Sequence, residues 1–466
     1  MTIENYRDLH PLTPQSFRTW CEQFIIGYRS KRVLQNVYEF RVTMRDDEAS
    51  GVLASPQFLG ALRKVRRVNH VRLPFIGTDG LLKLLPEGYH QETETLTLAE
   101  VDYDTDMPLD LAVETVNRLL GEFCFSDGER SKAVAIAGMV GLFANQLLPE
   151  KGLRPCFILV ANAEGAGKTL LVQIIILPTL GAMPVGSKAD EEAEMRKVIL
   201  TAVREGCAVI FLDNLKGRLS SPALEAFLSS PAYTGRKLGV SESISGDNLA
   251  TVFVTGNGLT VSPDMRRRSL FVELHLEHER PEDRQFQRVL DFASLNAMRP
   301  QILAALWAMV RHWNEQGRPQ ASRSHSAFPS WANTIGGIVE AAGFACPLET
   351  ANVTAAADPD GEDMRALVEA MAETRKAHTF GEVIELARKQ GLFESTIGTA
   401  GDTDRRERTA FGHMLTRYHE RRVLDYRFLA KGKGKTRLYE VECAGNDRND
   451  GNDIFRRRNS AISRGR

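Results

Sequence analysis

Between residues 155 and 275, short apolar runs of strand length alternate with longer segments that have a helical pattern. Strands that alternate with helices in this way predict an α/β fold with a largely parallel sheet. The four expected strands are residues 156 to 161, 208 to 212, 251 to 255 and 270 to 274.

The chain before this region has a mixed pattern. Residues 38 to 42 alternate like a strand, and residues 71 to 85 predict a hairpin with a tight turn at Asp79-Gly80. Residues 108 to 148 are helical in pattern. The uncharged apolar run from 133 to 149 is shorter than the roughly 20 residues that a membrane helix needs. It therefore predicts a buried core helix, and we expect no membrane partner.

The chain after this region ends in a basic unit with the pattern of a winged helix. Two amphipathic helices, residues 379 to 392 and 407 to 423, precede two alternating strands around a Gly/Lys turn at 431 to 436. The expected organisation is an α+β N-terminal accessory unit (1–107), a core with a helical collar and a further helical region (108–345), a linker (346–363), the winged-helix domain (364–443) and a disordered basic tail (444–466).

Composition adds few constraints. The chain has 466 residues, which predicts two or three domains, and its 43% apolar and 26% charged residues exclude a long disordered chain. Six cysteines lack CxxC or Cys/His metal-ligand spacing, so neither a zinc site nor a disulfide framework is expected. The N-terminus has no apolar signal segment, and we expect a reducing cytoplasm.

Net charge hides a polarised distribution. Lys plus Arg is 59 and Asp plus Glu is 60, a balance that argues against a polyanionic partner. Residues 405 to 437, however, hold eleven Lys or Arg and three Asp or Glu, a local net charge of +8. Such charge predicts DNA phosphate contacts, and a solvated face of a protein-interaction domain is the alternative. The expected DNA-binding residues are Arg417, Arg421, Arg422, Lys431, Lys433 and Lys435.

The sharpest motif follows the first expected strand and opens a helix, which is the context of a Walker A loop. Small residues let backbone N–H groups surround a phosphate, Lys168 reaches the β- and γ-phosphates, and Thr169 coordinates Mg²⁺. Asn162 stands where the pattern has its first Gly, and Asn tolerates a left-handed backbone. The alternative is a Gly-rich turn that binds nothing. The expected ATP-binding residues are Asn162, Glu164, Gly165, Ala166, Gly167, Lys168 and Thr169.

The second expected strand ends in an acid. Asp213 would hold Mg²⁺ together with Thr169; a strand-end turn is the alternative. Many such ATPases carry a Glu at the next position, whereas Asn214 can orient a water but cannot accept its proton. Either another acid serves as the base or hydrolysis is slow. The other candidate acids are Glu191, Glu192 and Glu205.

Two further elements complete the set. The third strand leads to Asn257, which could contact the γ-phosphate or its water. An Arg run, residues 266 to 268, precedes the fourth strand, and a guanidinium can stabilise charge that develops on a phosphoryl group, often from a neighbouring subunit. A solvated surface turn is the alternative for the Arg run.

This ordered set resembles superfamily 3 helicases, an AAA+-type group, and most closely the helicase part of phage and plasmid primase-helicases. The resemblance implies phosphate sensing by Asn257 and an arginine finger at Arg267 or Arg268 in the pattern Asp-x-x-Arg-Arg. It also implies a DNA-facing hairpin in a ring channel, with Arg236 and Lys237 as candidates; an exposed hairpin with incidental charge is the alternative.

The resemblance covers roughly residues 70 to 345, including 74 to 89 and 328 to 344. No primase domain is recognisable upstream, so a separate primase is an expected partner.

The leading hypothesis is therefore an ATP- and Mg²⁺-dependent DNA helicase or replication initiator of a mobile element. It would act as a homo-oligomeric ring, expected to be hexameric, with single-stranded DNA in the channel and duplex or forked DNA on the winged helix. Asn214 keeps open a nucleotide-switched DNA-binding or loading ATPase without processive unwinding. A third hypothesis is a signalling ATPase whose winged helix contacts only proteins.

Overall fold

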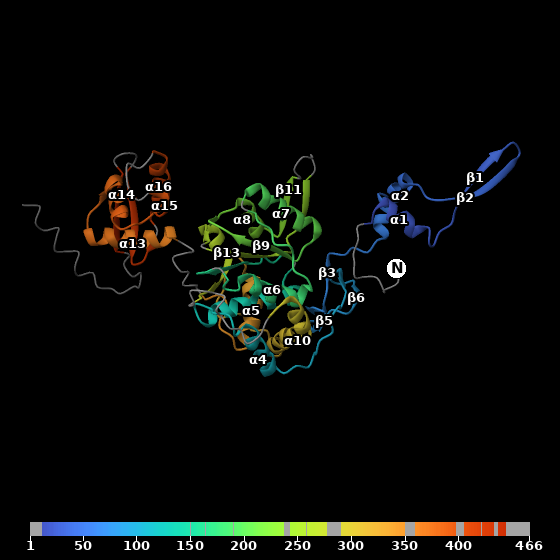
Figure 1. Cartoon of the computed structure of the whole chain (residues 1–466), viewed down its shortest axis with the longest axis horizontal. Helices are drawn as coiled ribbons and strands as arrows, with labels where there is room; N and C mark the ends of the chain where they lie inside the picture. The colour runs from blue at the N-terminus through green and yellow to red at the C-terminus, as the bar shows by residue number, and fades with distance from the viewer. Residues whose placement is uncertain are drawn as a thin grey trace, which may run out of the picture. The chain divides into compact units, whose positions relative to one another are not determined.

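The computed structural model describes residues 12–149, 151–163, 165–189, 191–236, 243–257, 259–276, 290–349, 359–397, 405–420, 422–432 and 437–443. Contacts divide the chain into two compact units, Met1–Asn352 and Val353–Arg466. Figure 1 labels many of the helices and strands of the larger unit and the helices of the smaller one. The larger unit is an α/β structure, and the smaller unit combines helices with an antiparallel sheet.

The N-terminal segment forms three short helices and one hairpin. The helices share a small core of Phe17, Cys21 and Ala49. The hairpin confirms the strand predicted at residues 38 to 42, but most of its side chains are exposed, including the apolar Leu34 and Phe40. The elements are α1 (Pro14–Cys21), β1 (Gly27–Val33), β2 (Asn36–Val42), α2 (Asp46–Leu53) and α3 (Pro56–Ala61).

A parallel sheet of four strands lies at the centre of the larger unit. Its strands are β8 (Cys156–Ala161), β9 (Val209–Leu215), β13 (Thr251–Asn257) and β15 (Ser269–Leu274). Their spatial order is β15-β8-β13-β9, and every ladder between them is parallel. The predicted α/β fold and its four strands are therefore confirmed. Their nearly continuous apolar runs suit a sheet that is covered on both faces.

Helices cover this sheet. α6 (Lys168–Leu180) packs against α5 (Glu129–Phe143) and α10 (Phe292–Glu315), and α10 also packs against α4 (Leu109–Leu120). α7 (Glu192–Glu205) packs with α8 (Pro222–Ser229) and contacts β9 (Figure 1). Every α5 residue from 133 to 143 is buried, which confirms the predicted core helix.

Residues 71 to 107 belong to this same core. Leu73, Phe75 and Met107 are buried in one cluster with Phe157 of β8. The boundary predicted at residue 107 therefore does not separate two cores, because apolar side chains just before it, such as Tyr103, are buried. The strands of this segment are β3 (Arg67–Asn69), β4 (Pro74–Ile76), β5 (Leu82–Leu84), β6 (Gly88–His90) and β7 (Thr95–Thr97).

The β4–β5 pair is the predicted hairpin. It is antiparallel, and Gly80 in its turn has φ 77°, a conformation that favours glycine. The sequence pattern therefore identified both the hairpin and its turn residue.

The helical region after the sheet closes the core on an aromatic cluster. Trp331 is 1% exposed and packs edge-on against Phe157 and Phe328. The region comprises α11 (Pro329–Trp331), a π-helical turn (Ala332–Gly336) and α12 (Gly337–Ala341).

The smaller unit has one core between its helices and a four-stranded antiparallel sheet of order β16-β19-β18-β17. Its helices are α13 (Pro359–Thr374), α14 (Phe380–Lys389), α15 (Glu394–Ile397) and α16 (Arg405–Arg417). Its strands are β16 (His378–Thr379), β17 (Arg422–Val423), β18 (Tyr426–Lys431) and β19 (Leu438–Cys443).

The start of α13 differs from the prediction. The helix begins at Pro359, inside the stretch predicted as a linker, because proline is compatible with the first turn of a helix. The rest of that linker, residues 350 to 358, and the predicted disordered tail lie outside the described residues.

Two structural observations concern membranes and metals. Within the described ranges, no helix has the length and apolar character needed to cross a membrane. The same ranges contain no group of three His, Cys, Asp or Glu side chains arranged to hold a metal ion. All six cysteines are free thiols.

Candidate functional site

The predicted phosphate loop connects β8 to α6 and turns sharply between them. Gly165 and Gly167 have φ values of 75° and 88°, which glycine adopts without steric strain. Lys168 and Thr169 are the first two residues of α6, so the unpaired N–H groups of its first turn adjoin the loop. Glu164 lies outside the described residues.

Asn162 anchors the start of the loop through its side chain. Its amide nitrogen donates to the carbonyl of Leu276 (2.9 Å), and its amide oxygen accepts from the N–H of Leu276 (2.8 Å). Asn162 is absent from the residues with positive φ, so the structure does not use the tolerance of Asn for a left-handed backbone at this position. Its amide instead ties the loop to the segment after β15, a role that glycine cannot fill.

Lys168 is 8% exposed, and its ammonium lies 3.4 Å from the carbonyl oxygen of Ala163 at the start of the loop. The side chain therefore folds back over the loop. An ammonium held over the loop at the start of α6 is placed where phosphate oxygens bound by the loop would lie. These residues fit a nucleotide phosphate.

Asp213, near the end of β9, faces the first turn of α6. Its carboxylate accepts hydrogen bonds from the hydroxyls of Thr169 (3.2 Å) and Thr255 (2.6 Å). A carboxylate and a hydroxyl at this separation are oxygen ligands of the kind that Mg²⁺ prefers. The structure thus brings together the two residues predicted to bind the metal, and their donor set fits it.

Thr255 also supports the turn after Asp213. Asn214 has φ 56°, which Asn adopts more readily than most residues, and its N–H donates to the hydroxyl of Thr255 (2.8 Å). The register between β13 and β9 shifts between Val254 and Gly256. The Thr255 hydroxyl therefore accepts the Asn214 N–H at a point where the ladder is irregular.

Asn257 pairs in register with Ala161, the last residue of β8. Its backbone therefore lies beside the strand end from which the loop begins. Its side chain is not among the described parts of the chain.

Two of the three other candidate acids are engaged away from Asp213. Glu192 accepts hydrogen bonds from the Ser221 hydroxyl (2.6 Å) and the Ala223 N–H (3.0 Å) at the start of α8. Glu205 ends α7, roughly 20 Å along a 14-residue helix from Glu192. Glu191 precedes α7, four residues after Ser187, which bridges to Leu212 beside Asp213. Glu191 therefore remains the candidate acid.

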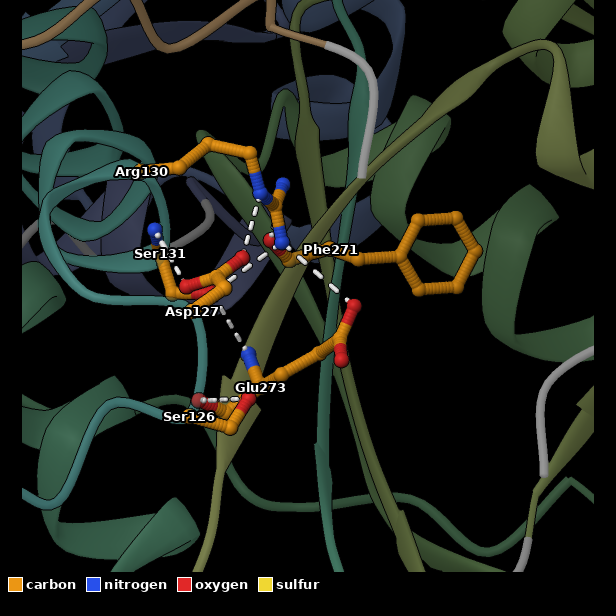
Figure 2. Close-up of polar contacts among 6 residues, drawn as sticks. All are labelled: Ser126, Asp127, Arg130, Ser131, Phe271 and Glu273. Atoms are coloured by element: carbon orange, nitrogen blue, oxygen red, sulfur yellow. Dashed lines mark hydrogen bonds and ion pairs between the residues drawn. The ribbon is translucent and has the colours of Figure 1, made fainter. Parts of the chain in front are cut away.

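A buried ion network fixes α5 to the end of β15 (Figure 2). Arg130 pairs with Asp127 (2.5 Å) and Glu273 (3.4 Å), and it donates to the carbonyl of Phe271 (3.0 Å). The Ser131 hydroxyl accepts from the Glu273 N–H (2.9 Å). The Arg130 and Glu273 side chains are 7% and 5% exposed, so removing Arg130 would deprive the carboxylates of Asp127 and Glu273 of a buried cation.

The segment before α5 lies against the loop. The Ser126 N–H donates to the carbonyl of Glu273 (3.0 Å), and the His275 N–H donates to the carbonyl of Cys124 (2.8 Å). Phe123 then packs on Gly167, since a Cβ placed there would be 3.1 Å from the Phe123 ring. The ion network therefore positions an aromatic side chain beside the phosphate loop.

The two arginine-finger candidates lie at the other edge of the sheet. They follow α9 (Pro263–Arg266), and Ser269, the next residue, pairs in register with Cys156 at the start of β8. The loop begins after the opposite end of β8, about 17 Å along a six-residue strand. Arg267 and Arg268 are therefore remote from the loop of their own chain.

These arginines differ in exposure. The Arg267 side chain is 72% exposed and pairs with Asp264, and this hydrogen bond lowers the pKa of the Asp264 carboxyl. Arg268 is 24% exposed and donates to the Ser229 hydroxyl (2.6 Å) and the Asp264 carbonyl (2.8 Å). Arg267 is thus the more accessible guanidinium, and Arg268 holds α9 to α8.

The predicted DNA-facing segment is a β-hairpin. β11 (Ala232–Arg236) and β12 (Ser243–Asp247) form an antiparallel ladder that packs on α7. Leu200 of α7 is so close to Gly235 that a Cβ there would be 2.7 Å from its side chain. Arg236 ends β11 with its side chain undescribed, and Lys237 lies outside the described residues.

The predicted DNA contacts of the smaller unit are only partly described. Lys431 pairs with Glu440 and Glu442, and these partners raise the pKa of its ammonium. Arg417 and Arg422 belong to described elements, but their side chains are not described; Arg421, Lys433 and Lys435 lie outside the described residues.

Several side chains near the loop were not predicted from the sequence. Thr255, Phe123 and Arg130 act through partners that are distant in the chain, so no local motif indicates them. The one available signal was the polar end of the third strand, which includes Thr255.

Comparisons with known proteins do not assign the chain to a family. No family model matches the chain, and no curated protein matches it. Two solved structures are similar to it at 9% identity, covering 93% of this chain and 100% of theirs. They are "The A form apo structure of NrS-1 C terminal region-CTR" (TM-score 0.38) and the same region described as residues 305-718 (TM-score 0.36). Likeness at this level supports no conclusion about fold or activity.

Proposed function

We propose that the chain is an ATP-dependent DNA motor or replication initiator of the superfamily 3 type, serving a phage, plasmid or other mobile element. The observation that carries the proposal is the meeting of Lys168 and Thr169, at the start of α6, with Asp213 at the end of β9. A glycine loop, a buried lysine and a hydroxyl–carboxylate pair together would make a site for a nucleoside triphosphate and Mg²⁺.

The roles follow from the side-chain chemistry. The loop N–H groups and Lys168 would hold the phosphates, while Thr169 and Asp213 would hold Mg²⁺. When bound, Mg²⁺ neutralises charge on the phosphate oxygens. Thr255 orients the Asp213 carboxylate through its 2.6 Å hydrogen bond.

An arginine finger in this protein would act between copies of the chain. Arg267 is exposed and lies one strand length from its own loop, so it could serve only the loop of a neighbouring copy. A closed ring, expected to be a hexamer, satisfies this arrangement at every boundary between subunits.

DNA contacts would come from two elements. The first is the β11–β12 hairpin, in which Arg236 ends β11 and Lys237 follows it in the sequence. In the smaller unit, α13, α14 and α16 pack with strands β16, β19 and β18, an arrangement typical of a winged helix. Its basic α16 and strand turn would bind duplex or forked DNA.

Lys168→Ala tests the proposal directly. The variant should lose ATP-dependent unwinding of a fluorescent forked duplex while keeping most of its DNA affinity, because the DNA elements lie outside the loop. Lys83→Ala, which removes an exposed lysine from β5, is the matched control and should unwind normally. Normal unwinding by Lys168→Ala would contradict the motor.

A nucleotide-switched DNA-binding or loading ATPase is the second candidate. It is favoured by Asn214, which cannot accept a proton, and by the engagement of Glu192 with α8. Turnover with and without single-stranded DNA separates the two: fast, DNA-stimulated turnover supports the motor, whereas ATP-dependent assembly with negligible turnover supports the switch.

A further inference from the structure

A cleft near the strand-start edge of the sheet contains arginines that the proposed ATP site does not use. Two adjoining cavities, of about 730 and 380 Å³, share Arg66, Arg67, Asp247 and Leu249 in their linings. The cleft lies beside β3 and the base of the β11–β12 hairpin, where β12 ends at Asp247.

The acids nearest these arginines are already paired. Glu94 accepts from Lys64 (3.5 Å) and Arg66 (3.3 Å), and Asp247 lies 3.7 Å from Arg66. Glu92 is exposed at the rim of the smaller cavity. Most of the negative charge of the cleft is therefore balanced by Arg66 and Lys64.

Arg67 has no such partner. Across the described ranges it forms no ion pair, and its hydrogen bond is a long one, 3.5 Å, to the side-chain oxygen of Asn145. Burial and the neighbouring Arg66 lower its pKa, while the charge of Asp247 raises it. A half-buried guanidinium that has no direct ion pair is incompletely compensated.

A second guanidinium adds positive charge close to Arg67. Arg154 is 7% exposed and reaches only backbone carbonyls, those of Asn248 (3.2 Å) and Gly152 (3.4 Å). Burial, and next the charge of Arg67, lower its pKa to about 10. The positive charges of the two arginines therefore oppose each other near the cleft that Arg67 lines.

We infer that this cleft binds a phosphate group, which Arg67 contacts and Arg154 stabilises from behind. Guanidinium forks match phosphate oxygens in geometry and charge, and the cleft has room for the group. The favoured source is the backbone of a DNA strand, because the cleft opens at the base of the proposed DNA-facing hairpin. Only this choice of source rests on the proposed function; the phosphate site requires neither ATP turnover nor a ring.

Arg67→Met tests the inference on the full chain, with Lys168 intact. Anisotropy of a labelled oligothymidylate should show about tenfold weaker binding, the loss expected for a charge-assisted hydrogen bond. The slope of log affinity against log salt should shrink by about 0.7, the value for one phosphate of a single strand. Asp247→Asn should instead strengthen binding of the oligothymidylate, since it removes an acid from the cleft.

A matched control separates the site from general charge. Arg118→Met removes one exposed arginine from α4 and should change neither quantity. Arg67→Lys keeps the charge, so it should bind the oligothymidylate more tightly than Arg67→Met does. Circular dichroism checks that both variants are folded. Equal losses in Arg67→Met and Arg118→Met would overturn the inference.

Inorganic phosphate distinguishes the source. It should raise the melting temperature of the wild type more than chloride does at equal ionic strength, and this gain should vanish in Arg67→Met. If that gain vanishes while DNA affinity is unchanged, the site takes free phosphate. If Arg67→Met keeps both the wild-type gain and the wild-type DNA affinity, the cleft is not a phosphate site.

Discussion

The carboxyl ends and the amino ends of the four central strands form two edges of the sheet, and these edges carry different functional groups. The carboxyl edge carries the glycine loop, Lys168 and the Thr169–Asp213–Thr255 cluster. The amino edge carries Arg268 at the start of β15 and Arg154 just before β8. Parallel strands make this separation possible, because every segment that follows a strand emerges on one edge.

The distance between the edges has a functional consequence. A strand of six residues holds them about 17 Å apart, which no arginine side chain spans within one chain. An ATP site that needs both edges must therefore combine two copies of the protein. The following predictions test this division, from the largest expected effect to the smallest.

Arg267→Ala should lower DNA-stimulated ATP turnover about 1,000-fold, the loss typical of an arginine finger, while labelled-nucleotide binding persists. Arg268→Ala should reduce turnover less and should lower the melting temperature instead, because Arg268 bonds to Ser229 and Asp264. A larger turnover loss in Arg268→Ala than in Arg267→Ala would assign the finger to the other arginine.

Arg130→Met should cost about 3 kcal/mol of unfolding free energy, because the carboxylates of Asp127 and Glu273 would both lose the buried Arg130 guanidinium. Denaturant unfolding measures this, with Arg118→Met as the exposed control. A loss no larger than that of Arg118→Met would contradict the ion network.

Thr255→Val should raise the activation free energy of ATP turnover by about 1 kcal/mol at limiting Mg²⁺, which corresponds to roughly fivefold slower turnover. The valine keeps the β-branched shape but loses both hydrogen bonds, to Asp213 and from Asn214. Saturating Mg²⁺ should restore most of the rate if the role of Thr255 is to orient the carboxylate. Wild-type Mg²⁺ dependence in the variant would exclude that role.

The sequence predicted the parts of the fold that depend on local pattern. Apolar runs identified β8, β9, β13 and β15, and the Asp79-Gly80 pair identified the β4–β5 turn. The loop motif placed Lys168 and Thr169 at a helix start because strand, loop and helix are contiguous in the chain.

What the sequence could not supply depends on contacts between distant segments. Arg130 meets Glu273, 143 residues away, and Asn162 pairs with Leu276, 114 residues away. The motif placed Asn162 in the loop but could not indicate the contact of its side chain with Leu276. The packing of residues 71 to 107 on the main core was missed because it depends on such long-range contacts, which no local pattern indicates.

A mixing experiment tests the central claim, that each ATP site combines the carboxyl edge of one copy with the amino edge of another. Lys168→Ala and Arg267→Ala should each lack DNA-stimulated turnover, because one damages the loop and the other the finger. Equal amounts mixed before ring assembly should recover about a quarter of wild-type turnover, since random pairing joins an intact loop to an intact finger at that frequency. No recovery from mixed rings would contradict a site shared between copies.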